Sequence, residues 1–127
     1  MSKRILIVDD SASVRQVVGI ALKGAGYEVV EGMDGVDALT KLDGSKYHLI
    51  ISDVNMPRMD GITFVKETKK LPAYKFTPII ILTTESSDEL KKKGKAAGAS
   101  GWIVKPFQAD QLLKVLRLLL KYPHRDR

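Results

Sequence analysis

The chain alternates between short apolar runs and longer amphipathic segments, and this alternation limits the folds that it can adopt. Four compact runs lie at residues 5–8, 49–51, 79–82 and 102–104, and a more polar one at 27–31 suits the edge of a sheet. The four runs are rich in β-branched residues and do not alternate with polar positions, which is typical of strands buried on both faces. The runs therefore predict a parallel sheet that is covered by helices.

Segments with helical spacing separate these runs. Apolar residues recur at intervals of three and four, as on one face of a helix. The stripes are Val14, Val17, Val18, Ala21 and Leu22; Val36, Leu39 and Leu42 after Asp34 as N-cap; Phe64, Val65, Thr68 and Leu71 between Asp60 and Pro72; a thin one opened by a capping box at 86–89 and weakened by Gly94; and Leu112, Leu113, Leu116, Leu119 and Leu120 before Pro123. A strand followed by a helix, five times over, predicts an open, doubly wound α/β sheet.

Length and composition set the class of protein. The 127 residues suit one globular domain, and 44% hydrophobic with 28% charged residues excludes disordered, collagen-like and membrane proteins. The chain has no cysteine, so we expect a reducing cytoplasm and no thiol chemistry. Its longest apolar runs contain four residues, against about 20 for a membrane span. We expect the loop at 72–78 and the tail at 122–127 to be flexible.

Polar side chains follow four of the five expected strands. Asp9 and Asp10 follow the first, Asp53 the third, Thr83 the fourth and Lys105 the fifth. Taken singly, each has a structural explanation, such as a helix cap or a strand-end residue. Ligands of such sheets bind outside the carboxyl ends of the strands, so the combination favours a functional site at this edge.

The charges of these residues predict the chemistry of the site. Three carboxylates outnumber the one ammonium, and like charges about 4 Å apart repel by about 4 kcal/mol at an effective dielectric constant of about 20. A divalent cation would cancel the excess, and ligands that are all oxygen suit Mg²⁺. Lys105 and Thr83 remain as donors for an anion beside that metal. The sequence thus predicts a phosphoryl site with a carboxylate nucleophile.

Three motifs and one threonine carry a family resemblance. Residues 5–11 read Ile-Leu-Ile-Val-Asp-Asp-Ser, residues 53–61 read Asp-Val-Asn-Met-Pro-Arg-Met-Asp-Gly, residues 101–107 read Gly-Trp-Ile-Val-Lys-Pro-Phe, and Thr83 ends the fourth run. The chain resembles response-regulator receiver domains over nearly its whole length, most closely the single-domain chemotaxis regulators of the CheY type. The resemblance implies a flavodoxin-like sheet with strand order 2-1-3-4-5 and five helices. It also implies a single receiver domain at 1–127 with no output domain.

The resemblance implies a role for each acidic residue. Asp53 would accept a phosphoryl group from a phosphohistidine on a sensor histidine kinase, so the protein would be a signalling switch of a two-component system and not an enzyme. Asp10 and Asp53 would bind Mg²⁺ directly, the main-chain carbonyl of Asn55 would complete the protein ligands, and Asp9 would act through water. No other cofactor is expected.

The resemblance also assigns the switch residues. Lys105 would pair with one phosphoryl oxygen, and Thr83 would move to hydrogen-bond another. Trp102 occupies the place of the switch aromatic, usually Tyr or Phe, with an ordinary half-buried core residue as the alternative. Glu85, like Asn55, occupies a position that tunes hydrolysis of the acyl phosphate, with a solvated surface acid as the alternative. Thr84 departs from the small residue that is usual after Thr83, so the lifetime of the phosphoryl group is left open.

Partners follow from the resemblance and from the charge. Residues 1–60 hold 7 basic and 9 acidic side chains, whereas residues 61–127 hold 14 and 6. The lysine run at 91–95 is by default a solvated helix face; alternatively it docks an acidic partner such as a flagellar switch protein. Nucleic acid is not expected, because the run has no interleaved aromatic residues. A membrane partner is not expected either, and the protein should be mostly monomeric.

Several functions remain open at this point. The leading hypothesis is a chemotaxis switch that signals to the flagellar motor through protein contact. Within the same class, the alternative is a phosphorelay intermediate whose partner is a second histidine phosphotransferase. A phosphatase with an aspartate nucleophile, as in the haloacid dehalogenase family, is disfavoured because position 11 is Ser where that family has a second Asp. A scaffold with the receiver fold and no phosphorylation is the remaining alternative.

Overall fold

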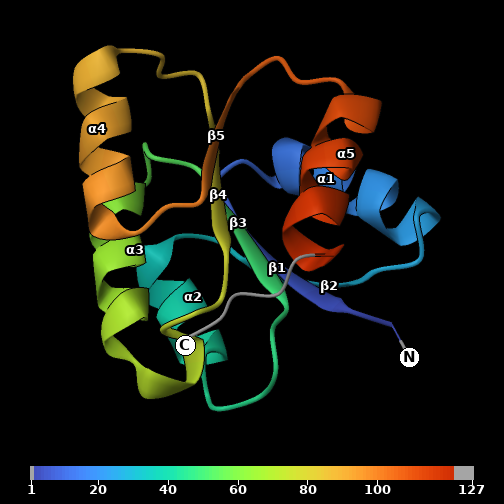
Figure 1. The fold of residues 1–127 in the computed structure, drawn as a ribbon, viewed down its shortest axis with the longest axis horizontal. Helices are drawn as coiled ribbons and strands as arrows, with labels where there is room; N and C mark the ends of the chain where they lie inside the picture. The colour runs from blue at the N-terminus through green and yellow to red at the C-terminus, as the bar shows by residue number, and fades with distance from the viewer. Residues whose placement is uncertain (1, 122–127) are drawn as a thin grey trace.

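The computed structural model describes residues 2–121, which form a sheet of five parallel strands with helices on both faces (Figure 1). The strand order is β2-β1-β3-β4-β5. The strands are β1 (Arg4–Val8), β2 (Glu28–Gly32), β3 (Leu49–Ser52), β4 (Ile79–Thr83) and β5 (Gly101–Val104). The helices are α1 (Ala12–Gly24), α2 (Gly35–Lys41), α3 (Gly61–Lys70), α4 (Asp88–Ala97) and α5 (Ala109–Lys121), with a short 3₁₀ helix at Pro72–Tyr74. The predicted fold and strand order are confirmed.

The core consists of two layers, one on each face of the sheet. Helices α1 and α5 cover one face, and α2, α3 and α4 cover the other (Figure 1). In β1, Leu6 and Val8 pack on the α2–α4 side, whereas Ile5 and Ile7 pack on the α1–α5 side. Burial on both faces is why the central strands read as unbroken apolar runs. Strand β2 pairs with β1 alone and is half-polar, as expected for an edge.

At the starts of four helices, a side chain accepts a hydrogen bond from a main-chain N–H of the first turn that has no partner within the helix. The N-caps are Ser11, Asp34, Asp60 and Ser87. The prediction of a capping box at 86–89 is wrong, because Ser87 and not Ser86 caps α4, which begins one residue later than the box requires. The third helical position is therefore Leu90, an apolar side chain that cannot bond back to the cap.

The loop at 72–78 differs from the prediction of flexibility. Its first residues form the 3₁₀ helix, and Tyr74 is 2% exposed. The Tyr74 hydroxyl donates to the main-chain oxygen of Ser45 at 2.7 Å and accepts from the Gly44 N–H at 2.9 Å. A buried ring with both hydrogen bonds made anchors this segment. The tail at 122–127, the other segment with predicted flexibility, lies outside the described residues.

The residues that the structure describes include no helix long and apolar enough to cross a membrane.

Thr68 in α3 is expected to limit stability. Its side chain is 0% exposed, and its hydroxyl oxygen is the single buried side-chain polar atom within 2–121 that has no hydrogen-bond partner. Thr68→Val removes the hydroxyl at nearly the same shape and should raise the free energy of unfolding by about 1 kcal/mol in urea denaturation. Thr68→Ser, which keeps the hydroxyl and loses a methyl group, should lower it. A less stable Val variant would contradict this account.

Candidate functional site

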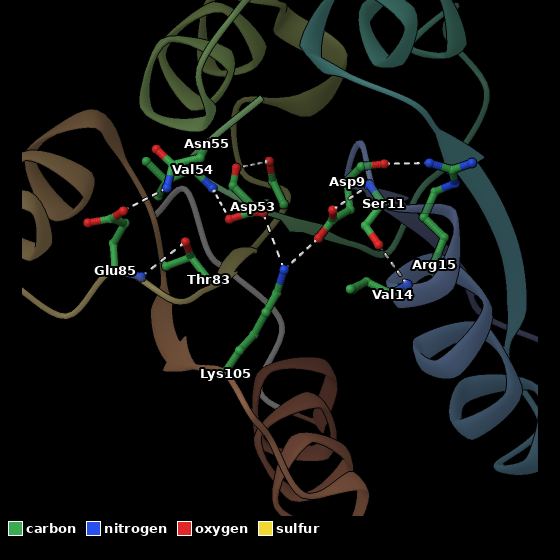
Figure 2. A network of polar contacts seen from close by, with 11 residues as sticks. Asp9, Ser11, Val14, Arg15, Asp53, Val54, Asn55, Thr83, Glu85 and Lys105 are labelled. Carbon is green, nitrogen blue, oxygen red and sulfur yellow. Dashed lines mark hydrogen bonds and ion pairs between the residues drawn. The ribbon is translucent and has the colours of Figure 1, made fainter. Parts of the chain in front are cut away.

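The predicted site residues lie together at the carboxyl edge of the sheet, where parallel strands end side by side (Figure 2). Asp9 and Asp10 follow β1, Asp53 follows β3, Thr83 is the last residue of β4, and Lys105 follows β5. Asp9 and Asp53 are buried at 3% and 8% exposure, whereas Asp10 is exposed. The edge therefore presents two shielded carboxylates and one that faces solvent.

The three carboxylates form one cluster with Lys105. One carboxylate oxygen from each of Asp9, Asp10 and Asp53 lies within 4.8 Å of the other two. The Lys105 Nζ donates to Oδ2 of Asp9 at 2.8 Å and to Oδ2 of Asp53 at 3.2 Å (Figure 2). This places a single ammonium between two carboxylates that come from different strands.

The environment shifts the pKa values of Asp9 and Lys105. Burial raises the pKa of the Asp9 carboxyl, although hydrogen bonds from Lys105 and from the Ser11 N–H partly oppose the rise. Burial alone would lower the pKa of Lys105, but its hydrogen bond to Asp9 and the negative charge of Asp53 outweigh burial and raise it. Lys105 therefore stays charged at neutral pH.

Main-chain contacts fix the two buried carboxylates. Oδ1 of Asp9 accepts from the Ser11 N–H at 2.9 Å, and Oδ1 of Asp53 accepts from the Val54 N–H at 2.6 Å. The Asp53 N–H bonds in turn to the main-chain oxygen of Val8 in the neighbouring strand at 3.0 Å. Each carboxylate thus has one oxygen held by the backbone and a second that meets Lys105.

The start of α3 lies directly against the backbone of Asp53. The Gly61 N–H donates to the Val54 main-chain oxygen at 2.8 Å, and a Cβ at Gly61 would stand 1.9 Å from the main-chain oxygen of Asp53. No side chain fits in that space. Glycine at this position allows the helix to begin close enough to hold the backbone that carries the buried carboxylate.

A second group of predicted residues lies beside the carboxylates, and Figure 2 shows its members Asn55, Thr83 and Glu85. The Asn55 side-chain amide donates to the Glu85 carboxylate at 2.7 Å, and the Glu85 N–H donates to the hydroxyl oxygen of Thr83 at 3.3 Å. The Trp102 indole N–H donates to the main-chain oxygen of Glu85 at 2.9 Å. Among residues 2–121, no hydrogen bond joins this group to the Asp53 carboxylate. Glu85 therefore links the loops that follow β3 and β4 with an aromatic side chain of β5.

Trp102 also explains a glycine in α4. The predicted weakness of this helix at Gly94 has a packing reason, because a Cβ at Gly94 would stand 2.8 Å from Cζ3 of the indole ring. Trp102 itself is half-buried. The bulky aromatic and the glycine fit each other, so the ring lies against α4 while its N–H reaches Glu85.

Sequence reasoning missed Arg15, which belongs to the site. Its side chain, 13% exposed, donates to the main-chain oxygen of Asp9 at 2.6 Å (Figure 2). It also donates to the Glu31 carboxylate at 2.8 Å. It thereby ties α1 to the ends of β1 and β2. The available signal was an arginine beside the apolar stripe of α1, four residues after the helix cap Ser11.

The acidic cluster fits a hard divalent cation. Its side-chain donors are all carboxylate oxygens, and they lie close enough together to share one ion. Oxygen ligands of this kind select Mg²⁺ or Ca²⁺ over softer metals. Asn55 lies two residues after Asp53, and its main-chain carbonyl carries an oxygen of the kind that such cations bind.

Comparisons with known proteins identify the family of this chain. The model of the response regulator receiver domain matches residues 5–117. The chemotaxis protein CheY1 of Helicobacter pylori is 37% identical over 119 residues, which cover 92% of this chain and 96% of that protein. The gliding motility regulatory protein of Myxococcus xanthus is 40% identical over 102 residues, 80% of this chain. That match spans 13% of the Myxococcus protein, so the similarity concerns one part of a much longer chain.

Solved structures extend the comparison. The structure of chemotaxis protein CheY4 of Vibrio cholerae shares 52% identity and a TM-score of 0.91, covering 94% of this chain and 100% of that one. The receiver domain of sensor histidine kinase PA1611 of Pseudomonas aeruginosa PAO1, with a magnesium ion coordinated in its active-site cleft, shares 25% identity and a TM-score of 0.89. It covers 96% of this chain and 100% of that one. With this fold, this edge cluster and a family match over most of its length, the chain belongs to the response regulator receiver domain family.

Proposed function

We propose that this receiver is a phosphorylation switch in which Asp53 accepts a phosphoryl group from a phosphohistidine on a sensor histidine kinase. The observation that carries the proposal is the place of Asp53 in the site. A carboxylate oxygen lies within 4.8 Å of those of Asp9 and Asp10, and Oδ2 lies 3.2 Å from the Lys105 ammonium. A carboxylate that shares a site with acidic oxygens and a fixed cation has the surroundings of a phosphoacceptor.

Mg²⁺ would be held by Asp10, Asp53 and the main-chain oxygen of Asn55, with Asp9 acting through water. When bound, the ion would neutralise the charge shared by the carboxylates and the incoming phosphoryl oxygens. The donor set of this cluster and the magnesium ion in the PA1611 receiver domain support this choice. An ion at this place would also reduce the repulsion among the three carboxylates.

The chain's own residues supply the remaining parts of the transfer. An Asp53 carboxylate oxygen attacks phosphorus while the phosphorus–nitrogen bond to the donor imidazole breaks; the imidazole nitrogen keeps the electron pair and takes up a proton. The Val54 N–H fixes Oδ1 of Asp53 at 2.6 Å, which orients the nucleophile. Lys105, whose pKa is raised by Asp9 and Asp53, remains charged and can pair with a phosphoryl oxygen.

Phosphorylation would then change the second group of residues. It replaces one carboxylate charge with roughly two and adds acceptor oxygens. Thr83 now accepts from the Glu85 N–H at 3.3 Å, so its own hydroxyl proton can be donated to a phosphoryl oxygen. Movement of Thr83 would shift Glu85, and the bond from the Trp102 N–H to the Glu85 carbonyl would pass that shift to the aromatic ring. Trp102 is in this proposal the switch aromatic.

In this proposal, the protein acts as a stand-alone signalling switch. Its chemistry is limited to its own phosphorylation and dephosphorylation, and its output is a contact with another protein. The CheY4 chain of Vibrio cholerae, which this chain matches over 100% of that chain, supports an architecture with one receiver domain. A chemotaxis role is supported by the names of the CheY1 and CheY4 proteins to which this chain is similar.

Incubation with acetyl phosphate and Mg²⁺, followed by intact-mass measurement, tests the phosphorylation. We expect an adduct with the mass of one phosphoryl group that disappears in EDTA and in Asp53→Asn, since Asn cannot form the acyl phosphate. Glu67→Gln on the exposed face of α3 is the matched control and should be phosphorylated normally. An adduct that persists in Asp53→Asn would move the phosphoacceptor elsewhere, and no adduct with either acetyl phosphate or a histidine kinase would favour the scaffold.

The groove between α4 and β5 is the proposed contact surface for an acidic partner, such as a flagellar switch protein. Its volume is about 330 Å³, and its lining includes Lys91, Lys95 and Trp102. The lysines supply positive charge. Trp102 also donates its N–H to Glu85, so the groove adjoins the residues that phosphorylation would shift. A histidine phosphotransferase is the alternative partner.

Charge reversal in this groove tests the contact. Lys91→Glu with Lys95→Glu should weaken binding of the phosphorylated protein to the flagellar switch protein of the same organism by about tenfold, and should flatten its salt dependence. Lys66→Glu with Lys70→Glu, two exposed lysines of α3, is the matched control and should change affinity far less. Fluorescence anisotropy over a range of salt concentrations measures both. Equal effects of the two pairs would exclude this groove as the contact surface.

A further inference from the structure

The loop between β3 and α3 contains a strained turn. Arg58 has a φ of 67°, and it is the single non-glycine residue with a positive φ in the described part of the chain. The Met59 N–H donates to the Pro57 main-chain oxygen at 2.7 Å, which closes a three-residue γ-turn with Arg58 at its centre. A γ-turn with positive φ at its central residue is rare and unfavourable for a side chain with a Cβ. Contacts outside the turn must therefore hold it.

An ion pair with the start of α2 is the first of these contacts. Nε of Arg58 donates to Oδ2 of Asp34 at 2.9 Å, and Nη2 donates to Oδ1 at 3.0 Å, so the guanidinium engages both oxygens. Asp34 is 5% exposed and also caps α2 by accepting from the Asp37 N–H at 2.8 Å. The hydrogen bond from Asp37 and the ion pair with Arg58 hold the pKa of Asp34 below its usual value despite its burial. The turn is thus fixed to a carboxylate that is itself fixed to a helix.

Apolar packing adds a second contact at the same place. Gly35, the first residue of α2, lies under the side chain of Met59: a Cβ at Gly35 would stand 2.9 Å from the Met59 sulfur. The tip of the loop therefore rests on the first turn of α2 through two neighbouring residues, one by charge and one by packing.

The position of this contact relates it to the proposed metal site. The loop leaves β3 at Asp53, and its far end is held where the Gly61 N–H meets the Val54 oxygen. Strand β1, which is followed by Asp9 and Asp10, lies between β3 and β2 in the sheet, and α2 follows β2. Through Arg58 the loop meets the start of α2, which follows the strand on the other side of β1. Asn55, three residues before Arg58, lies in this loop between Asp53 and the strained turn.

We propose that Arg58 and Asp34 are positioning residues for the metal site: their ion pair holds the strained turn, and the turn places the main-chain carbonyl of Asn55 where it can bind the ion. This inference rests on the proposed Mg²⁺ site. Without the ion pair the turn can relax toward a negative φ, and the carbonyl loses its fixed place relative to Asp10 and Asp53. Groups that orient ligands in this way typically contribute about tenfold or more to metal affinity.

Three variants separate positioning from stability. Asp34→Asn keeps an N-cap side chain for α2 but removes the charge that Arg58 binds. Arg58→Gly removes the ion pair yet relieves the strain of the positive φ, so the fold should lose little stability. Arg58→Lys keeps the positive charge but cannot bind both Asp34 oxygens in the same geometry, so this variant should retain part of the Mg²⁺ affinity that Arg58→Gly loses. Glu67→Gln, which breaks an exposed ion pair on α3, is the matched control.

Calorimetric titration with Mg²⁺, alongside urea unfolding, measures the outcome. We expect Asp34→Asn and Arg58→Gly each to weaken Mg²⁺ binding by about tenfold, the double variant to be no weaker than either, and Arg58→Lys to lie between them and the unmodified protein. Affinities within twofold of the unmodified protein would overturn this inference and leave the phosphorylation proposal standing. Additive effects in the double variant would also overturn it. Failure of the unmodified protein to bind Mg²⁺ would overturn both proposals.

Discussion

Gly61→Ala should lower the free energy of unfolding by at least about 3 kcal/mol, because the new Cβ would stand 1.9 Å from the main-chain oxygen of Asp53 and 2.9 Å from the Val54 Cα. Both neighbours are backbone atoms of the buried segment that directly follows β3, so neither can rotate away as a side chain could. The start of α3 would have to move and break the bond from the Gly61 N–H to Val54. The effect should appear as a lower urea midpoint with an unchanged slope.

The loss should extend to the proposed chemistry of Asp53. Displacing α3 displaces the peptide that holds the carboxylate through the Val54 N–H, so the rate of phosphorylation by acetyl phosphate should fall even under conditions where the variant is folded. Gly24→Ala is the matched control, because no atom lies within 4 Å of its added Cβ and the residue ends α1. That variant should be as stable as the unmodified protein or more stable by up to about 1 kcal/mol. Equal stability of both variants would refute the steric account.

Lys105→Met should destabilise the protein by about 3 kcal/mol at pH 7.5 without Mg²⁺. The substitution removes the ammonium that donates to Asp9 at 2.8 Å and to Asp53 at 3.2 Å, and it leaves two buried carboxylates beside Asp10 without a positive partner. Met has nearly the same length as Lys and fills the space of its stem, so loss of charge should dominate over loss of packing. Lys95→Met, at an exposed lysine of α4, is the matched control and should change stability little.

The dependence on pH and on metal identifies the cause. Burial already raises the pKa of Asp9, and without the Lys105 hydrogen bond that pKa should rise further. When the pKa of a carboxyl is higher in the folded than in the unfolded state, the free energy of unfolding falls as pH rises between the two pKa values. The stability difference between the variant and the unmodified protein should therefore shrink as pH falls from 7.5 toward 5. Mg²⁺ should restore more stability to the variant than to the unmodified protein. A deficit that is constant with pH and Mg²⁺ would point to packing instead.

Several elements could be predicted from local sequence because their cause is local. The unbroken apolar run in β1 is predictable since both of its faces are buried, with Leu6 packing on one side and Ile7 on the other. The N-cap Asp34 was predictable because its side chain accepts a hydrogen bond from the backbone three residues later. The boundary of α4 was predicted one residue early, because two adjacent serines can each cap a helix and only Ser87 does so here.

The composition of the site is likewise a property of the sequence. Parallel strands end at one edge of the sheet, so residues that follow β1, β3 and β5 lie near one another there. The residue types at positions 53 and 105 show that a carboxylate and an ammonium are among them. The strand order was predicted from the resemblance to receiver domains. Distances such as the 2.8 Å from Lys105 to Asp9 depend on how residues 96 positions apart pack, and no local pattern encodes them.

What the sequence by itself determined is the fold class, the edge of the sheet that carries the chemistry and the kinds of side chain that meet there, because each follows from periodicity and from strand ends. What only the tertiary structure decided is how separate loops hold those side chains. The pairing of Arg58 with Asp34, the lack of space at Gly61 and the fit of Trp102 to Gly94 each join residues from different elements. Such contacts depend on the distances between packed helices and strands, which are set only when the whole core assembles.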